Sequence, residues 1–242
     1  MQAAIITGVS RGLGEAIAAD LLSRGWYVLG VGRKSSGRLS GERYRFVEID
    51  LAGAAGIDTA LCDRFSEIER SHPSSVVCIN NAAVAGPIGV AGRLKASDIA
   101  ASVAINLAAP CALANLFCRV FVDRNQDRRI INVSSGAAQT ALPGSAIYCA
   151  AKSGLEMLTR VLAEEQGRNG VRVIALRPGI LDTDMQAFMR AQTEDVLPTA
   201  DLFKGFHERG QLVAPATAAA KIITNIVLAR IEQGRTYSYA DL

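Results

Sequence analysis

Residues 3–14 read AAIITGVSRGLG, an apolar run followed directly by a glycine-rich turn. The run Ala3–Thr7 has the length of a short buried strand, and Leu13–Arg24 carries apolar residues at helical spacing. The three glycines, spaced G-x-x-x-G-x-G, permit positive φ and let the backbone approach a ligand closely. A helix that begins in such a turn offers free N–H groups and the positive end of its dipole to a pyrophosphate. The stretch therefore predicts a strand–turn–helix unit that binds a dinucleotide.

Strand-like and helix-like segments alternate along the rest of the chain. Further strands are expected at Trp26–Val31, Arg45–Ile49, Val76–Ile79, Arg129–Val133, Val171–Leu176 and Thr236–Tyr239. Helices are expected at Ile57–Arg70, Ser97–Val122, Tyr148–Gln166 and Ala216–Ile231. The strands are solidly apolar, as in parallel sheets that helices cover on both faces. We therefore expect one doubly wound α/β domain of the Rossmann type over residues 1–242.

One stretch of mixed polarity, residues 182–213, follows the strand Val171–Leu176 and contains Pro198. Open α/β sheets bind their ligands at the carboxyl ends of the strands. We therefore expect residues 182–213 to form a lid or wall over a substrate.

Composition narrows the class of protein. Half of the 242 residues are hydrophobic and the net charge is only +3, with Lys and Arg scattered, which argues against a nucleic-acid partner. The five cysteines form no CxxC pair, so neither a disulfide framework nor a metal site is expected. We see no signal peptide and no apolar stretch of about 18 residues, and expect a cytoplasmic protein without a membrane partner.

The choice of nucleotide follows from charge after the second strand. An NAD site usually places an acidic residue there, on the ribose 2′-hydroxyl. This sequence has Arg33 and Lys34 instead, with Arg11 in the glycine turn. Guanidinium groups suit a 2′-phosphate, so NADP(H) is the expected cofactor. Asp50, after the third strand, is placed to meet the adenine amino group.

Tyr148 and Lys152 are four residues apart at the start of an expected helix, which places them on one face. A nearby ammonium favours the phenolate and is expected to lower the tyrosine pKa. Such a tyrosine can give a proton to a carbonyl oxygen during hydride transfer. Ser135 ends a buried strand, and Asn106 lies inside the long helix, where a buried amide needs partners.

The sequence resembles the short-chain dehydrogenase/reductase family. The motifs that carry the resemblance are Thr7–Gly14, Asn80–Ala83, Asn106, Ser135, Tyr148–Lys152 and Pro178–Thr183. The resemblance covers nearly the whole chain and implies a Rossmann sheet of about seven strands with a nicotinamide cofactor. It implies that Tyr148 is the acid–base, that Lys152 assists it and binds the ribose, that Ser135 orients the substrate carbonyl and that Asn106 holds a water. The stretch Asn80–Ala83 has an alanine where the family usually has glycine. The family also implies a homodimer or homotetramer, paired through Ser97–Val122 and the Tyr148 helix.

The positions expected to contact the cofactor are Gly8, Ser10, Arg11, Gly12, Leu13, Gly14, Arg33, Asp50, Leu51, Asn80, Ala82, Tyr148, Lys152, Pro178, Gly179, Leu181 and Thr183. No metal ligand is expected.

A narrower likeness concerns Gly179–Gln186 and the end of the chain, which are similar to sepiapterin reductases and bacterial benzil reductases. Sepiapterin reductases anchor the pterin with an aspartate in the last strand; that aspartate falls on Ser238 here, with Asp241 three residues further on. A diketone or an aromatic ketone is therefore as compatible with the sequence as a pterin, and the expected reaction is reduction of a small ketone or diketone. Rival hypotheses are an NADP-dependent alcohol, steroid or sugar dehydrogenase, an acyl-thioester ketoreductase, or a non-catalytic dinucleotide sensor.

Overall fold

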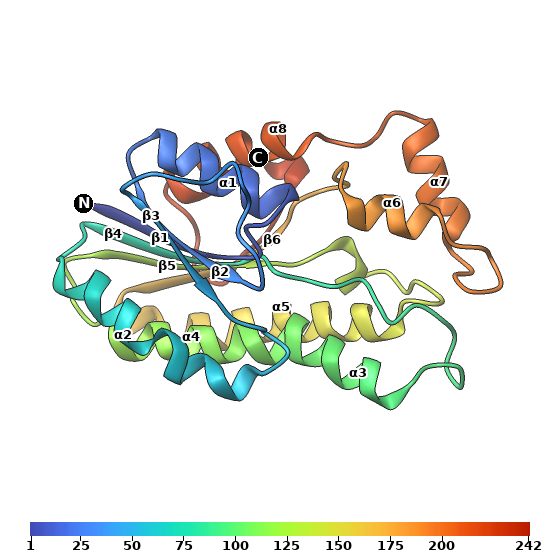
Figure 1. Ribbon diagram of the computed structural model, residues 1–242, viewed down its shortest axis with the longest axis horizontal. Coiled ribbons are helices and arrows are strands. Elements are labelled where there is room, and N and C mark those ends of the chain that lie inside the picture. The colour runs from blue at the N-terminus through green and yellow to red at the C-terminus, as the bar shows by residue number, and fades with distance from the viewer.

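A seven-stranded parallel sheet runs through the centre of the computed structural model, which describes all 242 residues (Figure 1). Its strand order is β3-β2-β1-β4-β5-β6-β7. The strands are β1 (Gln2–Thr7), β2 (Tyr27–Gly32), β3 (Tyr44–Glu48), β4 (Ser75–Asn80), β5 (Asp127–Val133), β6 (Val171–Arg177) and β7 (Thr236–Ser238). The predicted fold class is confirmed, and each expected strand is present with bounds shifted by no more than a few residues.

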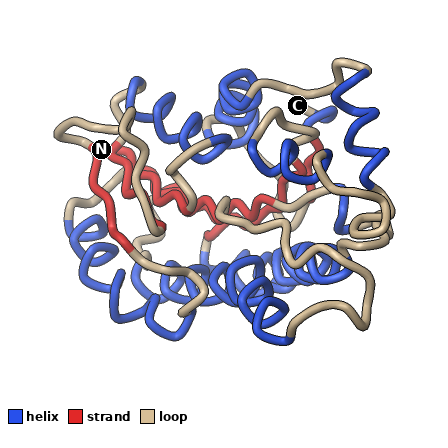
Figure 2. The backbone as a smooth tube through the Cα atoms, turned by 45° about the vertical axis from the view of Figure 1, so that its right-hand side comes forward, coloured by secondary structure: helices blue, strands red, loops and turns tan.

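Helices cover both faces of this sheet, as Figure 2 shows. One face is covered by α1 (Gly12–Ser23) and α8 (Pro215–Ile222), and the other by α2 (Ile57–Arg70), α4 (Ala109–Val120) and α5 (Ala146–Gln166). Alternate residues of β1 serve the two sides, because successive side chains of a strand point to opposite faces. Ile6 packs in the core with α1 and α8, whereas Ile5 packs in the core with α2 and α4.

The strand order reverses direction between β1 and β4. The chain leaves β1 into α1 on one side of the sheet, and later leaves β4 toward α3 (Ala96–Val103) on the other. Diverging connections of this kind open a crevice at the carboxyl ends of the strands. Beyond that edge lie α6 (Asp184–Arg190) and α7 (Ala200–Glu208), within the stretch expected to be a lid (Figure 1).

The long helix over Ala96–Val120 consists of α3, a π-helical turn at Ala104–Ala108 and α4. By length and composition alone it could cross a membrane, since its most apolar window has a mean hydropathy of 1.7. The helix contains no uninterrupted apolar stretch of 18 residues, as expected from the sequence, and its mean hydropathy is high because the scattered polar residues are small and mostly uncharged. In the fold, Leu113, Leu116 and Phe117 pack against the sheet, so this helix serves the core.

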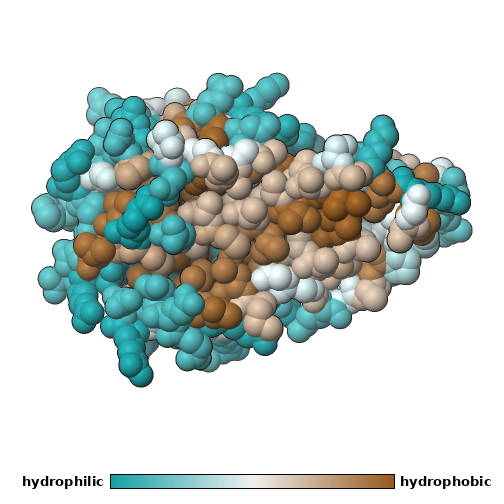
Figure 3. Space-filling model, turned by 90° about the horizontal axis from the view of Figure 1, so that it is seen from below, coloured by the Kyte–Doolittle hydropathy of each residue, from teal (hydrophilic) through white to brown (hydrophobic).

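The outer side of this helical layer is apolar as well. Figure 3 shows a band of hydrophobic residues across the face seen from below, the side on which α4 and α5 lie in Figure 1. Val103 of the long helix, with Met157 and Val161 of α5, are large apolar side chains exposed by 37%, 51% and 45%. We call these three residues the apolar band.

Candidate active site

A cleft of about 1030 Å³ follows the carboxyl ends of the strands. Its lining comes from the glycine turn after β1, from the segments after β2, β3, β4, β5 and β6, and from the start of α5. Segments that are far apart in sequence thus meet at one edge of the sheet, where the topology opens a crevice.

The glycine turn is shaped for a phosphate group. Gly8 and Gly12 have φ values of 75° and 63°, which a glycine adopts without strain. A Cβ on Gly14 would lie 2.3 Å from the Gly8 carbonyl oxygen, so this glycine allows α1 to pack against the turn. On Gly12 a Cβ would meet only Thr183 Cγ2, at 3.4 Å, which leaves room beside the turn. No side chain caps the N-terminus of α1, so its free N–H groups and the space beside them fit a dinucleotide pyrophosphate.

A hydrogen-bond network that sequence reasoning missed joins this turn to the end of β4. Thr7 Oγ1 accepts hydrogen bonds from the backbone N–H groups of Asn81 (3.0 Å) and Ala82 (2.9 Å). Asn81 Nδ2 donates in return to the Thr7 carbonyl oxygen at 2.9 Å. The network holds the end of β1 against the end of β4, where the crevice opens. Its only sequence signal is polar residues at the ends of two apolar strands.

The cationic side chains of the cleft fall into two groups. Arg33 and Lys34 are exposed, line the cleft and form no ion pair. Arg11 also lines the cleft, but its guanidinium contacts the Asp184 carboxylate at the start of α6, 2.5 Å away. Asp50 is exposed at the same end and accepts a hydrogen bond from the Ala52 N–H. Arg33 and Lys34 are therefore the cations available to a ligand phosphate.

Tyr148 and Lys152 lie in the first two turns of α5 and both line the cleft. Lys152 is only 2% exposed; its Nζ donates to the Val133 carbonyl oxygen at 2.7 Å and lies 5.7 Å from the centre of the Tyr148 ring. Ser135 follows Val133 at the end of β5, and its Oγ accepts a hydrogen bond from the Ala137 N–H. The structure thus brings together the three residues that the sequence singled out.

The pKa values of this site differ in direction from the expectation. Burial raises the pKa of the Tyr148 phenol to about 12, and a hydrogen bond with Ser135 opposes that rise only in part. Burial also lowers the pKa of the Lys152 ammonium to about 8. The expected lowering of the Tyr148 pKa is therefore not present, because loss of hydration outweighs any stabilisation of the phenolate. Tyr148 consequently holds its proton at neutral pH, as a proton donor must.

Asn106 lies in the π-helical turn and is fully buried. Its Oδ1 accepts from the Val84 N–H at 3.0 Å and its Nδ2 donates to the Val84 carbonyl oxygen at 2.9 Å. The amide also contacts Ser102 Oγ. Asn106 thereby fixes the segment after β4 that lines the cleft, and π-turns of this kind are frequent at functional sites.

Not every predicted contact residue lines the cleft. Those that do are Gly8, Ser10, Arg11, Gly12, Leu13, Arg33, Asp50, Leu51, Ala82, Tyr148, Lys152, Pro178, Leu181 and Thr183. Gly14, Asn80 and Gly179 are not among the lining residues: Gly14 packs under the turn, Asn80 donates to Asn132 Oδ1 in the core, and Gly179 lies against Tyr239.

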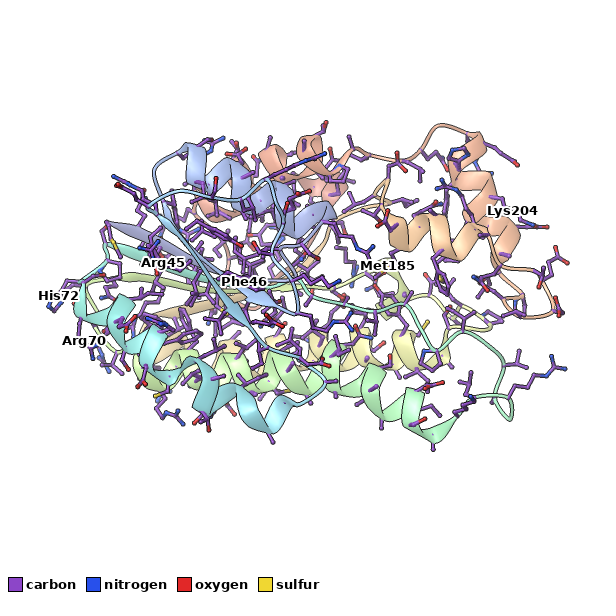
Figure 4. All side chains as sticks on the ribbon, in the orientation of Figure 1. Arg45, Phe46, Arg70, His72, Met185 and Lys204 are labelled. Atoms are coloured by element: carbon purple, nitrogen blue, oxygen red, sulfur yellow. The ribbon has the colours of Figure 1, made fainter.

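Part of the cleft lining is an apolar wall, a property that sequence reasoning did not assign to particular residues. It includes Val84 and Ala85 after β4, Ile105 of the π-helical turn, and Met185 and Phe188 of α6. Figure 4 marks Met185 at the inner end of α6, between that helix and the sheet. Neither Ser238 nor Asp241 reaches the cleft; the Asp241 carboxylate accepts a hydrogen bond from the Ser238 N–H in the last turn of the chain.

Comparison with known proteins defines the class. The family model described as short chain dehydrogenase matches residues 2–194. A benzil reductase ((S)-benzoin forming) from Bacillus cereus is 33% identical over 235 residues, 94% of each chain. A sepiapterin reductase from Xenopus tropicalis is 31% identical and covers 90% of this chain and 88% of its own. The crystal structure of the KRED1-Pglu enzyme matches with a TM-score of 0.84 and 26% identity, over 98% of this chain and 100% of the other.

The chain therefore belongs to the short-chain dehydrogenase/reductase family. It is an oxidoreductase of the class that uses a nicotinamide cofactor, and the branch predicted from sequence is confirmed, since benzil and sepiapterin reductases are among its relatives.

Proposed function

We propose that this protein reduces a small ketone or diketone to an alcohol, with NADPH as the cofactor and Tyr148 as the proton donor. The observation that carries the proposal is the geometry of Tyr148, which lines the cleft with the Nζ of the buried Lys152 5.7 Å from its ring centre and with Ser135 at the adjoining end of β5. The nicotinamide supplies the hydride when it is bound.

The side chains act on the oxygen that becomes an alcohol. Tyr148 Oη gives its proton to that oxygen as negative charge develops on it. The Lys152 ammonium, held by the Val133 carbonyl oxygen, stabilises the phenolate that Tyr148 leaves behind. Ser135 Oγ contacts the same oxygen and sets its direction toward Tyr148.

Arg33 and Lys34 support the choice of NADPH, because both lie unpaired where the cleft leaves β2. A guanidinium group forms paired hydrogen bonds with a phosphate, whereas no acidic residue after β2 is present to bind a 2′-hydroxyl.

The apolar wall supports an apolar, flat substrate. Val84, Ile105 and Phe188 offer no charged group to a substrate, and the carboxylate of Asp241, which a pterin would need, lies outside the cleft. A diketone or aromatic ketone fits this wall better than a pterin does.

We further propose that the apolar band pairs with a second copy of the chain, giving a homodimer or homotetramer. Exposed apolar side chains gathered on one face mark association surfaces. The five free cysteines support a reducing compartment, and we propose the cytoplasm.

The test is a panel of ketones and diketones, sepiapterin included, with consumption of NADPH followed by absorbance. We expect turnover of an aromatic diketone, and a loss of about a thousandfold in kcat/KM in Tyr148→Phe, because general acid catalysis contributes that much. Tyr27→Phe, in β2 and outside the cleft, is the matched control and should keep wild-type kinetics. Near wild-type turnover by Tyr148→Phe would contradict the proton-donor role.

A further inference from the structure

An ion pair that the proposed reaction does not use lies directly behind the site. Glu156 is one helical turn beyond Lys152 on α5, on the same side of the helix. Its Oε1 accepts hydrogen bonds from Ser134 Oγ (2.7 Å) and Arg177 Nε (2.8 Å), and its Oε2 accepts from Arg177 Nη2 (2.7 Å). The Arg177 and Glu156 side chains are only 16% and 12% exposed. This is a bidentate pair with little access to water, the strongest type of side-chain ion pair.

The two residues that donate hydrogen bonds to Glu156, Ser134 and Arg177, each adjoin a residue of the candidate site or of the cleft lining. Ser134 directly precedes Ser135, and its N–H donates to the Leu176 carbonyl oxygen on β6 at 2.7 Å. Arg177 is the last residue of β6 and directly precedes Pro178, which lines the cleft. The same guanidinium donates through Nη1 to Gln139 Oε1, at 2.6 Å, in the connection between Ser135 and Tyr148.

We propose that Glu156 and Arg177 are positioning residues that hold the ends of β5 and β6 against α5, and thereby set the distance between Ser135, just after β5, and Tyr148 and Lys152, on α5. The inference rests on the proposed function, because it assigns these two residues a part in the reaction for which Ser135 and Tyr148 must meet one oxygen. The hydrogen bonds of the pair also lower the pKa of Glu156, so its carboxylate is charged at neutral pH despite its burial.

The same two strands offer a matched control at their opposite ends. Asp127, the first residue of β5, contacts Arg129 at 2.6 Å and Arg172 of β6 at 3.0 Å. This second pair also joins β5 to β6, yet it lies at the amino ends of the strands, away from the cleft. A variant of Asp127 therefore perturbs the same strands without touching the site.

The kinetic test compares Glu156→Gln, Arg177→Met, Arg177→Lys and Asp127→Asn with the wild type. In Glu156→Gln and Arg177→Met we expect kcat for the best ketone to fall about thirtyfold, because misplacement by about 1 Å can cost a hundredfold. The dissociation constant of NADPH, read from its fluorescence, should stay within about twofold, because the glycine turn is untouched. Arg177→Lys keeps the charge and should recover most of kcat, whereas Asp127→Asn should lose thermal stability and keep kcat.

A second measurement does not depend on turnover. Hydrogen exchange of the backbone amides, followed by mass spectrometry, should become faster in residues 134–139 and 177–183 of Glu156→Gln and stay unchanged there in Asp127→Asn. The inference is overturned if exchange in these segments does not change, or if Asp127→Asn lowers kcat as much as Glu156→Gln does. If the wild type reduces no carbonyl compound, the proposed function fails, and hydrogen exchange still decides whether the pair holds the two strand ends together.

Discussion

The two ends of the sheet use charged side chains in opposite ways. At the amino ends of β5 and β6, Arg129 has its partners within the protein. Its guanidinium forms an ion pair with Asp127 and donates hydrogen bonds to the carbonyl oxygens of Ile226 and Ala229. At the carboxyl ends of β1 to β6, Arg33 and Lys34 line the cleft and form no ion pair. Lys152 also lines it, and its Nζ donates a hydrogen bond to one carbonyl oxygen, that of Val133. The guanidinium of Arg129 at the amino end is thus paired within the fold, whereas the carboxyl end retains charges and N–H groups for a ligand. The difference predicts that substitutions at one end change catalysis and those at the other change stability.

The largest difference expected between the two ends of the sheet is the effect of substituting Arg33 on cofactor preference. Arg33→Ala should lower the preference for NADPH over NADH by about tenfold to a hundredfold in kcat/KM, the size of a lost hydrogen bond between charged groups. Arg38→Ala, a few residues further along the same connection and outside the lining of the cleft, is the control and should keep the preference. An unchanged preference in Arg33→Ala would show that the 2′-phosphate is not bound there.

The pH dependence sharpens the comparison at the carboxyl end. The pKa of Lys152 is lowered to about 8 and that of Tyr148 is raised to about 12, so the ammonium is the group that loses its proton first as pH rises. Carbonyl reduction should therefore decline above pH 8 and be about tenfold slower at pH 9 than on its neutral plateau. The check is kcat/KM from pH 6 to pH 10 with saturating NADPH. A flat profile to pH 10 would mean that the charge of Lys152 does not assist the reaction.

At the amino end, Asp127→Asn should lower the free energy of unfolding by about 2 kcal/mol, because Arg129 then lacks its charged partner in a buried position. Denaturant unfolding measures this value. The same variant should keep the pH profile and kcat of the wild type. A change in the profile would mean that the two ends of the strands are coupled.

The smallest effect on catalysis is expected from the outer side of α5. Met157 is the neighbour of Glu156 in sequence but is 51% exposed, on the apolar band. Met157→Glu should reduce the apparent mass in size-exclusion chromatography to that of one chain, because a charge is costly in an apolar interface. Its kcat should remain close to that of the wild type. An unchanged mass would place the contact between copies elsewhere.

Much of this fold is predictable because its signals are local. The apolar strand and glycine turn of residues 3–14, and the four-residue spacing of Tyr148 and Lys152, are each contained in one short segment. Such segments indicate where a strand ends and which side chains share a helix face.

What escaped prediction depends on segments that meet only in the fold. Glu156 and Arg177 are 21 residues apart, and Thr7 and Asn81 are 74 apart; no spacing rule connects them. The direction of the Tyr148 pKa was missed for a related reason, since burial raises this pKa and burial is a property of the whole packed structure. The pairing of Arg11 with Asp184 likewise joins the glycine turn to a helix far along the chain.

The amide of Asn106 bonds to both the N–H and the carbonyl of Val84, as a neighbouring strand would. The chain beyond β4 is consequently fixed at Val84 although no strand runs beside it. One wall of the cleft is therefore held by hydrogen bonds to the backbone, while the facing wall, built on the short helix α6, is held by side-chain contacts such as the ion pair of Asp184 with Arg11 and the hydrogen bond from Gln186 to the Phe203 carbonyl oxygen. A substrate has to conform to the first wall, and any accommodation of its size has to come from the second.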